Sequence, residues 1–220
     1  GRSGLRGTRD VRSNRKKEWS CILCDHRYEA VSLGETCPRD GGVLLEAEVR
    51  SRHKNDALLG KCIDQRYQLI DVLGIGGFGT VYRCFDTRRK TEFAFKTIAD
   101  HKLLNQSEVR QRFLQEGRLL AKLDSAYVVK VHETGEADDT LYMVLELVKG
   151  LSLKQYLTRK GQLPLEEAVA VTEQVLIALE HSHNAGLIHR DLKPSNILFT
   201  DLDAKSLKLI DFGIAKPLNS

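Results

Sequence analysis

Apolar residues in the middle of the chain fall into short strand-like runs, and those further on follow helical spacing. The runs Tyr67–Leu73, Val81–Phe85 and Phe93–Lys96 are bounded by turn residues, and the last one alternates strictly, which predicts strands. A continuous apolar run at Leu141–Val148 predicts a further, buried strand. The central part of the chain therefore predicts a sheet, in which the first two strands are antiparallel because a short loop joins them.

Two amphipathic patterns predict the main helices. Val109, Phe113, Leu120 and Leu123 lie near helical spacing in a helix expected over Gln106–Leu123. Ser152 is placed to cap a short helix that runs to Arg159. Pro164 then begins a long helix. The predicted buried stripe of this long helix consists of Ala168, Val171, Thr172, Val175, Leu176 and Leu179.

A glycine-rich segment joins the first two predicted strands. It places glycines at 74, 76, 77 and 79 and is followed by Val81. Because a glycine carries no side chain, the backbone there can approach phosphate groups closely. The segment connects two strands and does not open a helix, so the pattern is not that of a dinucleotide-binding loop. We therefore expect Gly74, Gly76, Gly77 and Gly79 to contact the phosphates of a nucleotide.

The strongest motif lies near the C-terminal end of the chain. Residues 189–196 read HRDLKPSN, and Asp211 begins the triplet DFG. Asp191 supplies a carboxylate that can accept a proton from a hydroxyl, and Lys193 can lie beside a transferring phosphate. Asn196 and Asp211 supply oxygen ligands of the kind that Mg²⁺ prefers. In this order and spacing the motifs resemble those of eukaryotic-type (Hanks-type) serine/threonine protein kinases.

The resemblance implies an α+β, bilobal protein-kinase-like fold over residues 67–220. Residues 67–148 would form the N-lobe, a five-stranded antiparallel sheet with the helix known as helix C. Residues 149–220 would form only the first part of the helical C-lobe. The implied activity is the ATP-dependent phosphorylation of serine and threonine hydroxyls on protein substrates, with ATP and Mg²⁺ as cofactors.

The resemblance also implies further site residues. Lys96 stands where the family's phosphate-binding lysine lies, and Glu116 matches the glutamate that pairs with it. The backbone of Glu146 and Val148 would bind the edge of adenine, next to Leu145 as the gatekeeper. The apolar residues that would sandwich the adenine ring are Val81, Ala94 and Leu198.

Composition and charge narrow the compartment and the partners. The chain has 220 residues and five cysteines, an odd number that argues against a disulfide framework and favours the reducing cytoplasm. No apolar stretch is long enough to span a bilayer. The net charge of +4 comes from residues 1–17, which hold seven basic side chains against Asp10 alone. We expect residues 1–18 to be a disordered basic tail and expect no nucleic-acid partner, because the folded part carries no basic excess.

Three cysteines ahead of the kinase-like segment suggest a metal site. Cys21 and Cys24 form a CxxC pair, and Cys37 opens the sequence CPRDG, in which Asp40 takes the place of a fourth cysteine. Such segments precede the kinase domain in some bacterial relatives. We therefore expect residues 19–45 to form a zinc-ribbon-like knuckle, with 46–66 as a polar linker. His26 or Cys62 could replace Asp40 as the fourth ligand, and the alternative is a loop with free thiols.

Two other classes of function remain open. A pseudokinase or regulatory nucleotide-binding scaffold would bind without turnover, but such proteins usually lose Lys96, Asp191 or Asp211. A small-molecule phosphotransferase typically lacks the motif at 189–196 together with this glycine loop. The chain ends nine residues past Asp211, inside the expected activation segment. We therefore expect a fragment of a longer kinase, with little activity on its own.

Overall fold

The structure is a computed structural model that describes residues 17–29, 31–76, 79–98, 107–200 and 205–212. Within the helix at 107–122, the side chains at positions 108, 109, 112 and 116 are not described. The tail expected at 1–18 therefore lies outside the described residues, except for its last two. None of the helices described is both long and apolar enough to cross a membrane.

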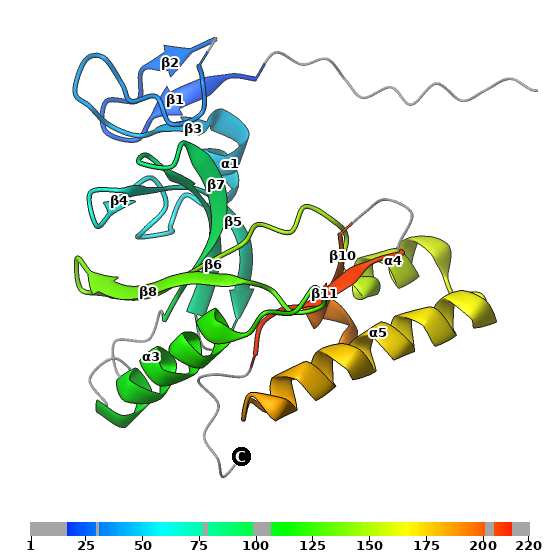
Figure 1. The fold of residues 1–220 in the computed structure, drawn as a ribbon. Coiled ribbons are helices and arrows are strands. Elements are labelled where there is room, and N and C mark those ends of the chain that lie inside the picture. The colour runs from blue at the N-terminus through cyan, green and yellow to red at the C-terminus, as the bar shows by residue number, and fades with distance from the viewer. Residues whose placement is uncertain (1–16, 30, 77–78, 99–106, 201–204, 213–220) are drawn as a thin grey trace, which may run out of the picture.

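The N-terminal part folds into a small antiparallel sheet followed by a helix. Its strands are β1 (Trp19–Cys21), β2 (Arg27–Tyr28) and β3 (Leu44–Glu46), in the order β2-β1-β3. Helix α1 (Ala47–Arg52) follows β3 directly. Figure 1 shows this unit stacked on the end of a larger sheet. We call residues 19–45 the cysteine knuckle.

The larger sheet has six strands among the described residues, in the order β4-β5-β6-β7-β9-β8. Their bounds are β4 (Cys62–Ile63), β5 (Tyr67–Gly76), β6 (Gly79–Asp86), β7 (Thr91–Thr97), β8 (Val131–Ala137) and β9 (Thr140–Leu145). All pairs are antiparallel. The five strands expected for an N-lobe are present, and the short β4 adds a sixth at the edge.

The two faces of this sheet belong to different cores, because alternate side chains of a strand point to opposite sides. Ala94, Met143 and Leu145 face the core that contains the helices. Phe93, Phe95, Tyr142 and Val144 face the core that contains the N-terminal segment. We call the first the inner face and the second the outer face. Lys96 alternates with Phe95 and so lies with the inner face.

Helices and two short strands form the second half of the molecule. They are α3 (Ser107–Lys122), α4 (Leu153–Lys160), α5 (Leu165–Asn184), the 3₁₀ turn η1 (Pro194–Asn196), β10 (Ile197–Phe199) and β11 (Leu207–Leu209). In Figure 1, α3 lies beside β8 while α4, α5, β10 and β11 form a separate group. One core joins both groups through Phe113, Leu120, Val131 and Phe212. The α+β, bilobal arrangement expected from the sequence is confirmed for the described residues.

Two of the predicted helices begin and end within one residue of the predicted positions. Helix α3 covers Ser107–Lys122, and Ser152 caps α4 through a capping box with Gln155. The buried stripe of α5 differs from the prediction. Val171 and Val175 are buried, but Thr172 is exposed and Leu176 is 60% exposed. The buried face instead turns toward Ala178 and Ser182.

The segment 46–66, expected to be a polar linker, is folded onto the larger sheet. Helix α1 and strand β4 both lie within it. Val49, Leu59 and Ile63 are buried in the core of the outer face. The sequence reads as polar because these apolar residues are few and follow no single period, and only tertiary contacts with the sheet bury them.

Candidate active site and candidate metal centre

The glycine-rich segment lies at the hairpin between β5 and β6, with Gly74 opposite Val81 and Gly76 opposite Gly79. Gly79 has φ of 154°, and a Cβ atom there would lie 1.8 Å from the carbonyl oxygen of Thr97. The fold itself therefore requires glycine at position 79. A Cβ atom on Gly74 would meet nothing within 4 Å, so the fold does not require glycine there. Gly77 lies outside the described residues.

Lys96 lies on β7 between Val81 of β6 and Met143 of β9. Its ammonium group forms an ion pair with the carboxylate of Asp211. The expected partner, Glu116, belongs to α3, but its side chain lies outside the described part of the structure. The structure therefore brings Lys96 to Asp211, two residues that the sequence predicted to bind the same nucleotide.

Asp191, Lys193 and Asn196 converge at the start of η1. The Lys193 Nζ lies 2.7 Å from the Asp191 Oδ2. The Asn196 side-chain amide donates to the backbone oxygen of Asp191 at 2.9 Å and to its Oδ2 at 3.0 Å. The hydrogen bond with Asp191 raises the pKa of Lys193, which keeps the ammonium charged. The three predicted catalytic residues thus form one hydrogen-bonded group.

His189 joins this group to the segment that carries Asp211. Its Nε2 lies 3.0 Å from the carbonyl oxygen of Ile210, and its Nδ1 accepts from the amide of Asp191 at 3.3 Å. Its ring also contacts Phe212, with centroids 4.5 Å apart. Burial lowers the pKa of His189, so the neutral ring with hydrogen on Nε2 fits both contacts.

Two residues of the site adopt backbone angles that L-residues rarely occupy. Arg190 and Asp211 both have φ of 58°. Such left-handed conformations of residues other than glycine are uncommon and cluster at functional sites. Arg190 directly precedes the carboxylate residue Asp191, and Asp211 carries the second carboxylate of the site. This placement agrees with a site whose carboxylates are aimed by the backbone.

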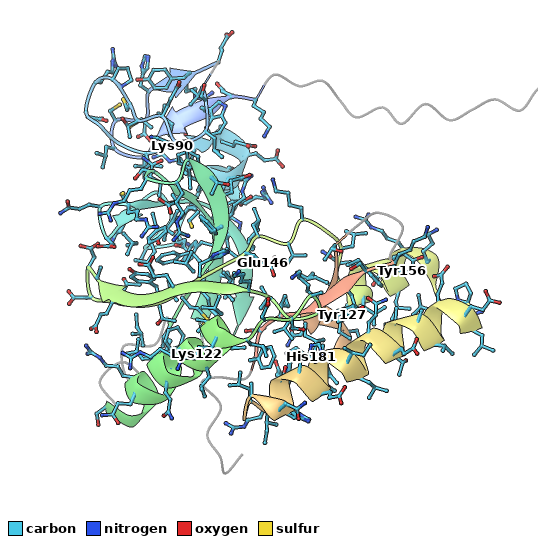
Figure 2. All side chains as sticks on the ribbon, in the orientation of Figure 1. Lys90, Lys122, Tyr127, Glu146, Tyr156 and His181 are labelled. Carbon is cyan, nitrogen blue, oxygen red and sulfur yellow. The ribbon has the colours of Figure 1, made fainter. Side chains whose placement is uncertain are left out.

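The residues expected around adenine line the junction between the sheet and the helical part. Ala94 pairs with Leu145 across β7 and β9, and Leu198 lies on β10. The Glu146 amide donates to the Lys130 carbonyl at 2.9 Å, and its carboxylate lies 2.7 Å from the Lys208 Nζ. Figure 2 shows Glu146 at this junction. Val148 packs against the shared core.

Comparison with known families decides what this assembly is. The family model described as "Protein kinase domain" matches residues 67–220. The chain belongs to the protein kinase family. Among its relatives is the serine/threonine-protein kinase PrkC of Bacillus subtilis, 39% identical over 163 residues that cover 74% of this chain. PknL of Mycobacterium tuberculosis is 35% identical over 173 residues, or 79% of this chain.

The match covers only part of these relatives. The chain spans 25% of the length of PrkC and 41% of that of PknL. Among solved structures, the M. tuberculosis PknI kinase domain has a TM-score of 0.64 at 29% identity and covers 73% of this chain and 64% of its own. Rad53 1-466 in complex with AMP-PNP has a TM-score of 0.62 at 30% identity, over 70% of this chain and 40% of its own.

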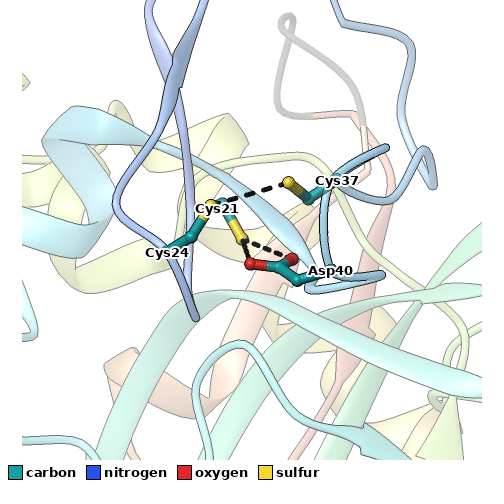
Figure 3. Close-up of side chains that lie close together, drawn as sticks. All are labelled: Cys21, Cys24, Cys37 and Asp40. Atoms are coloured by element: carbon teal, nitrogen blue, oxygen red, sulfur yellow. Dashed lines mark hydrogen bonds between the residues drawn. The ribbon is translucent and has the colours of Figure 1, made fainter.

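The cysteine knuckle brings four candidate metal ligands together. The ligand atoms of Cys21, Cys24, Cys37 and Asp40 all lie within 4.8 Å of one another. Figure 3 shows their side chains pointing toward a common centre. Neither His26 nor Cys62, the other candidates for a fourth ligand, belongs to this group among the described residues. Asp40 is therefore the residue that the fold places fourth.

The spacing of the four groups can be compared with a tetrahedron. With Zn–S distances of about 2.3 Å and Zn–O of about 2.0 Å, the S···S edges measure about 3.8 Å and the S···O edges about 3.5 Å. The Cys24 and Cys37 sulfurs are 3.7 Å apart. The Cys21 sulfur lies 3.2 and 3.6 Å from the two Asp40 oxygens. The residues present therefore fit a zinc ion.

A backbone amide and two side chains around these ligands hold them in position. The Gly42 amide donates to Asp40 Oδ1 at 2.9 Å, and this bond lowers the pKa of Asp40 to about 2, so the carboxylate is charged. Arg50 of α1 donates to the carbonyl oxygen of Cys21 at 2.8 Å, and the Tyr28 hydroxyl lies 3.0 Å from the Cys37 sulfur. No sequence pattern points to Tyr28 or Arg50, because no spacing rule connects them with the cysteines.

Proposed function

We propose that the whole protein transfers the γ-phosphate of ATP to serine and threonine hydroxyls of protein substrates. The observation that carries this proposal is the linkage through His189. It connects the group of Asp191, Lys193 and Asn196 to the Lys96–Asp211 pair. The names of the relatives support the substrate class, since PrkC and PknL are serine/threonine-protein kinases.

Each residue has a role that its surroundings support. Asp191 would orient the acceptor hydroxyl and take its proton, with Lys193 beside it to neutralise charge on the transferring phosphate. Lys96 and the glycine-rich hairpin would hold the other phosphates. Positioning and charge neutralisation are the main contributions to catalysis here, because the transition state of phosphoryl transfer is loose.

The oxygen donors of Asn196 and Asp211 fit magnesium. The Asn196 side-chain nitrogen donates to Asp191, and its carbonyl oxygen accepts from the Ser195 hydroxyl at 3.4 Å, which leaves one lone pair for a metal. Asp211 adds a carboxylate that is 40% exposed. These are the hard oxygen donors that Mg²⁺ prefers. When bound, magnesium would neutralise negative charge on the phosphates. Rad53 was solved with AMP-PNP, and we propose that ATP binds at the corresponding place in this chain.

A nucleotide-binding scaffold without turnover is not favoured. Lys96, Asp191 and Asp211 are all present, and each carboxylate pairs with a lysine: Asp211 with Lys96 and Asp191 with Lys193. A scaffold that had lost catalysis would have no need to keep this whole set.

Replacement of Asp191 by asparagine in the full-length protein tests the proposal. We expect Asp191→Asn to lower kcat by on the order of 10²–10⁴-fold, because the base is lost. Nucleotide binding should remain nearly unchanged. Asp124→Asn makes the same chemical change at an exposed position outside the site and should leave kcat unchanged. Full turnover by Asp191→Asn would remove this carboxylate from the proposed role.

We further propose that Cys21, Cys24, Cys37 and Asp40 bind one structural zinc ion. The clustering of the four ligand atoms supports this, with the Cys24–Cys37 and Cys21–Asp40 distances close to the edges of a zinc tetrahedron. The small size of the cysteine knuckle, which buries few residues of its own, also supports it. Thiolate ligands persist in a reducing compartment, so we propose that this part of the protein works in the cytoplasm. Elemental analysis of the purified chain should find about one zinc per molecule.

A further inference from the structure

The residues just before the matched kinase domain cover the outer face of its sheet. The family match begins at residue 67. The core of the outer face nevertheless includes five buried residues from earlier in the chain: Val43, Leu45, Val49, Leu59 and Ile63. They pack with large aromatic side chains of the sheet, among them Phe95 and Tyr142, whose stacked rings lie 4.8 Å apart. Residues before position 67 therefore complete the core on the outer face of the N-lobe sheet. We call residues 43–63, which carry these five side chains, the covering segment.

Close contacts at two glycines show that the cysteine knuckle packs tightly against both the sheet and the covering segment. A Cβ atom on Gly34 would lie 2.0 Å from the ring of Phe85 on β6. A Cβ atom on Gly60 would lie 2.7 Å from the side chain of Ile22, which stands between Cys21 and Cys24. Both glycines also have positive φ, of 87° and 85°. The cysteine knuckle thus contacts β6 directly through Gly34. It contacts the covering segment through Ile22, in the loop between Cys21 and Cys24.

Hydrogen bonds tie the covering segment to the same strands. The Tyr82 hydroxyl of β6 donates to the Asp56 carboxylate at 2.9 Å. The same carboxylate accepts from the amides of Leu58 and Leu59 at 2.9 and 2.8 Å, which fixes the loop that carries Leu59 into the core. The Gly60 amide donates to the Leu69 carbonyl of β5 at 2.8 Å. The covering segment is therefore anchored on β5 and β6.

The candidate metal ligands lie next to the two loops that meet the covering segment. Cys21 and Cys24 flank Ile22, whose amide donates to the Val43 carbonyl at 3.1 Å. Asp40 lies three residues before Val43, the first residue of the covering set. Beside these loops β1 also pairs with β3, with Cys21 opposite Leu44. A metal bound to all four ligands would add a further link, which joins the loop of Cys21 and Cys24 to the loop of Cys37 and Asp40.

We propose that metal binding at Cys21, Cys24, Cys37 and Asp40 clamps the cysteine knuckle onto the outer face of the sheet and thereby orders β6 and β7. The proposal rests on the zinc site and the kinase activity proposed above. Phe93 and Phe95 of β7 belong to the clamped face, while Ala94 and Lys96 of the same strand face the nucleotide side. Loss of the metal would therefore loosen the strand that carries Lys96.

Hydrogen exchange of the full chain tests the clamp, before and after chelation and again after zinc chloride is added back. We expect chelation to speed exchange in peptides that cover residues 80–86 and 92–97, with little change in α5, and zinc to restore protection. The melting temperature should fall by at least about 4 °C, the shift that a tenfold change in the folding equilibrium produces in a chain of this length. Zinc is measured on the same samples.

Variants separate the clamp from the zinc site. Cys24→Ser removes an exposed ligand and should reproduce the effect of chelation, whereas Cys62→Ser removes an exposed thiol outside the group and should not. Gly34→Ala should keep zinc but speed exchange in β6, because the knuckle can no longer rest on Phe85. If zinc is bound and its removal does not change hydrogen exchange in β6 and β7, the proposed clamp is wrong, although the zinc site itself stands. A chain without zinc would overturn the proposed metal site.

Discussion

At the scale of single residues, the glycines of the phosphate loop serve different purposes. Gly79 is required by the fold, since a Cβ atom would lie 1.8 Å from the Thr97 carbonyl oxygen, whereas Gly74 has open space around it. The sequence pattern alone could not distinguish the two, because both match the glycine-rich motif. The packing gives no reason for glycine at position 74, and the proposed close approach of phosphate would supply one.

Alanine variants separate these two purposes. We expect Gly79→Ala to destabilise the chain by about 1–3 kcal/mol or more, because the backbone would have to leave its position against Thr97. Gly74→Ala should change the free energy of unfolding by less than about 0.5 kcal/mol, yet weaken ATP binding. Urea unfolding and nucleotide titration of the two variants provide the measurements. Equal loss of stability in both would contradict the assignment.

His189 makes stability depend on pH through its burial. Its pKa is lowered in the folded state, so below its ordinary value of about 6.5 the unfolded chain binds the proton more readily. Stability is therefore full above that pH and is lost as the pH falls through the region between the ordinary and the lowered pKa. Burial also lowers the pKa of His132, which adds to the effect.

Thermal unfolding between pH 7.5 and 5 measures this dependence. We expect His189→Gln to be less stable than the parent at pH 7.5 but to lose less stability on acidification, because the buried titrating group is gone. His183→Gln, at an exposed position, should follow the parent at every pH. An unchanged slope in His189→Gln would show that this ring does not cause the loss at low pH.

At the scale of elements, the sequence best predicted the helices and strands that are long enough to show a periodic pattern of apolar residues. Helices α3 and α4 were found within one residue of the expected bounds, and α5 begins directly after Pro164, where its start was expected. Helix α1 has six residues and strand β4 only two, so neither is long enough to show a period. Their apolar residues became recognisable only when the sheet buried them. The partner of Lys96 could not be predicted either, because it depends on how two distant segments meet.

Arg66 connects three strands through a buried ion pair. Its guanidinium donates two hydrogen bonds to Asp86, of 3.0 and 2.7 Å, and a third of 2.9 Å to Glu133 of β8. The Asp86 side chain is fully buried. We expect Arg66→Met to cost about 3–5 kcal/mol of stability, since the buried carboxylate loses its two charged hydrogen bonds. Among the described residues, it would keep only the backbone amides of Arg88 and Arg89 and the Arg89 side chain at 3.8 Å.

Denaturant unfolding of the chain checks this cost. The matched variant is Arg88→Met, which removes an exposed arginine near the same turn and should change stability by less than about 0.5 kcal/mol. If Arg66→Met unfolds at the same denaturant concentration as Arg88→Met, the buried pair does not hold β5, β6 and β8 together.

At the scale of the whole molecule, the boundary of the folding unit lies before the boundary of the matched family. A chain of residues 67–220 would lack Leu45, Val49, Leu59 and Ile63, each of which contributes about 1.5–3 kcal/mol when fully buried. We expect this shorter chain to melt at a lower temperature than residues 17–220 and to aggregate more, because the aromatic outer face is exposed. Equal melting temperatures would show that the N-terminal segment adds nothing to the N-lobe.

Because Lys96 and Asp211 form an ion pair, nucleotide binding as proposed would exchange the partners of both charged groups. In the structure the ammonium and the carboxylate already neutralise each other. If Mg²⁺ and ATP bind as proposed, Lys96 trades a carboxylate for phosphate oxygens while Asp211 trades an ammonium for a dication. Each charge keeps a counter-charge at every stage, so neither has to be buried alone at the cost that an unpaired ion carries. The proposed site could therefore bind and release nucleotide repeatedly while the charge around Lys96 and Asp211 stays balanced.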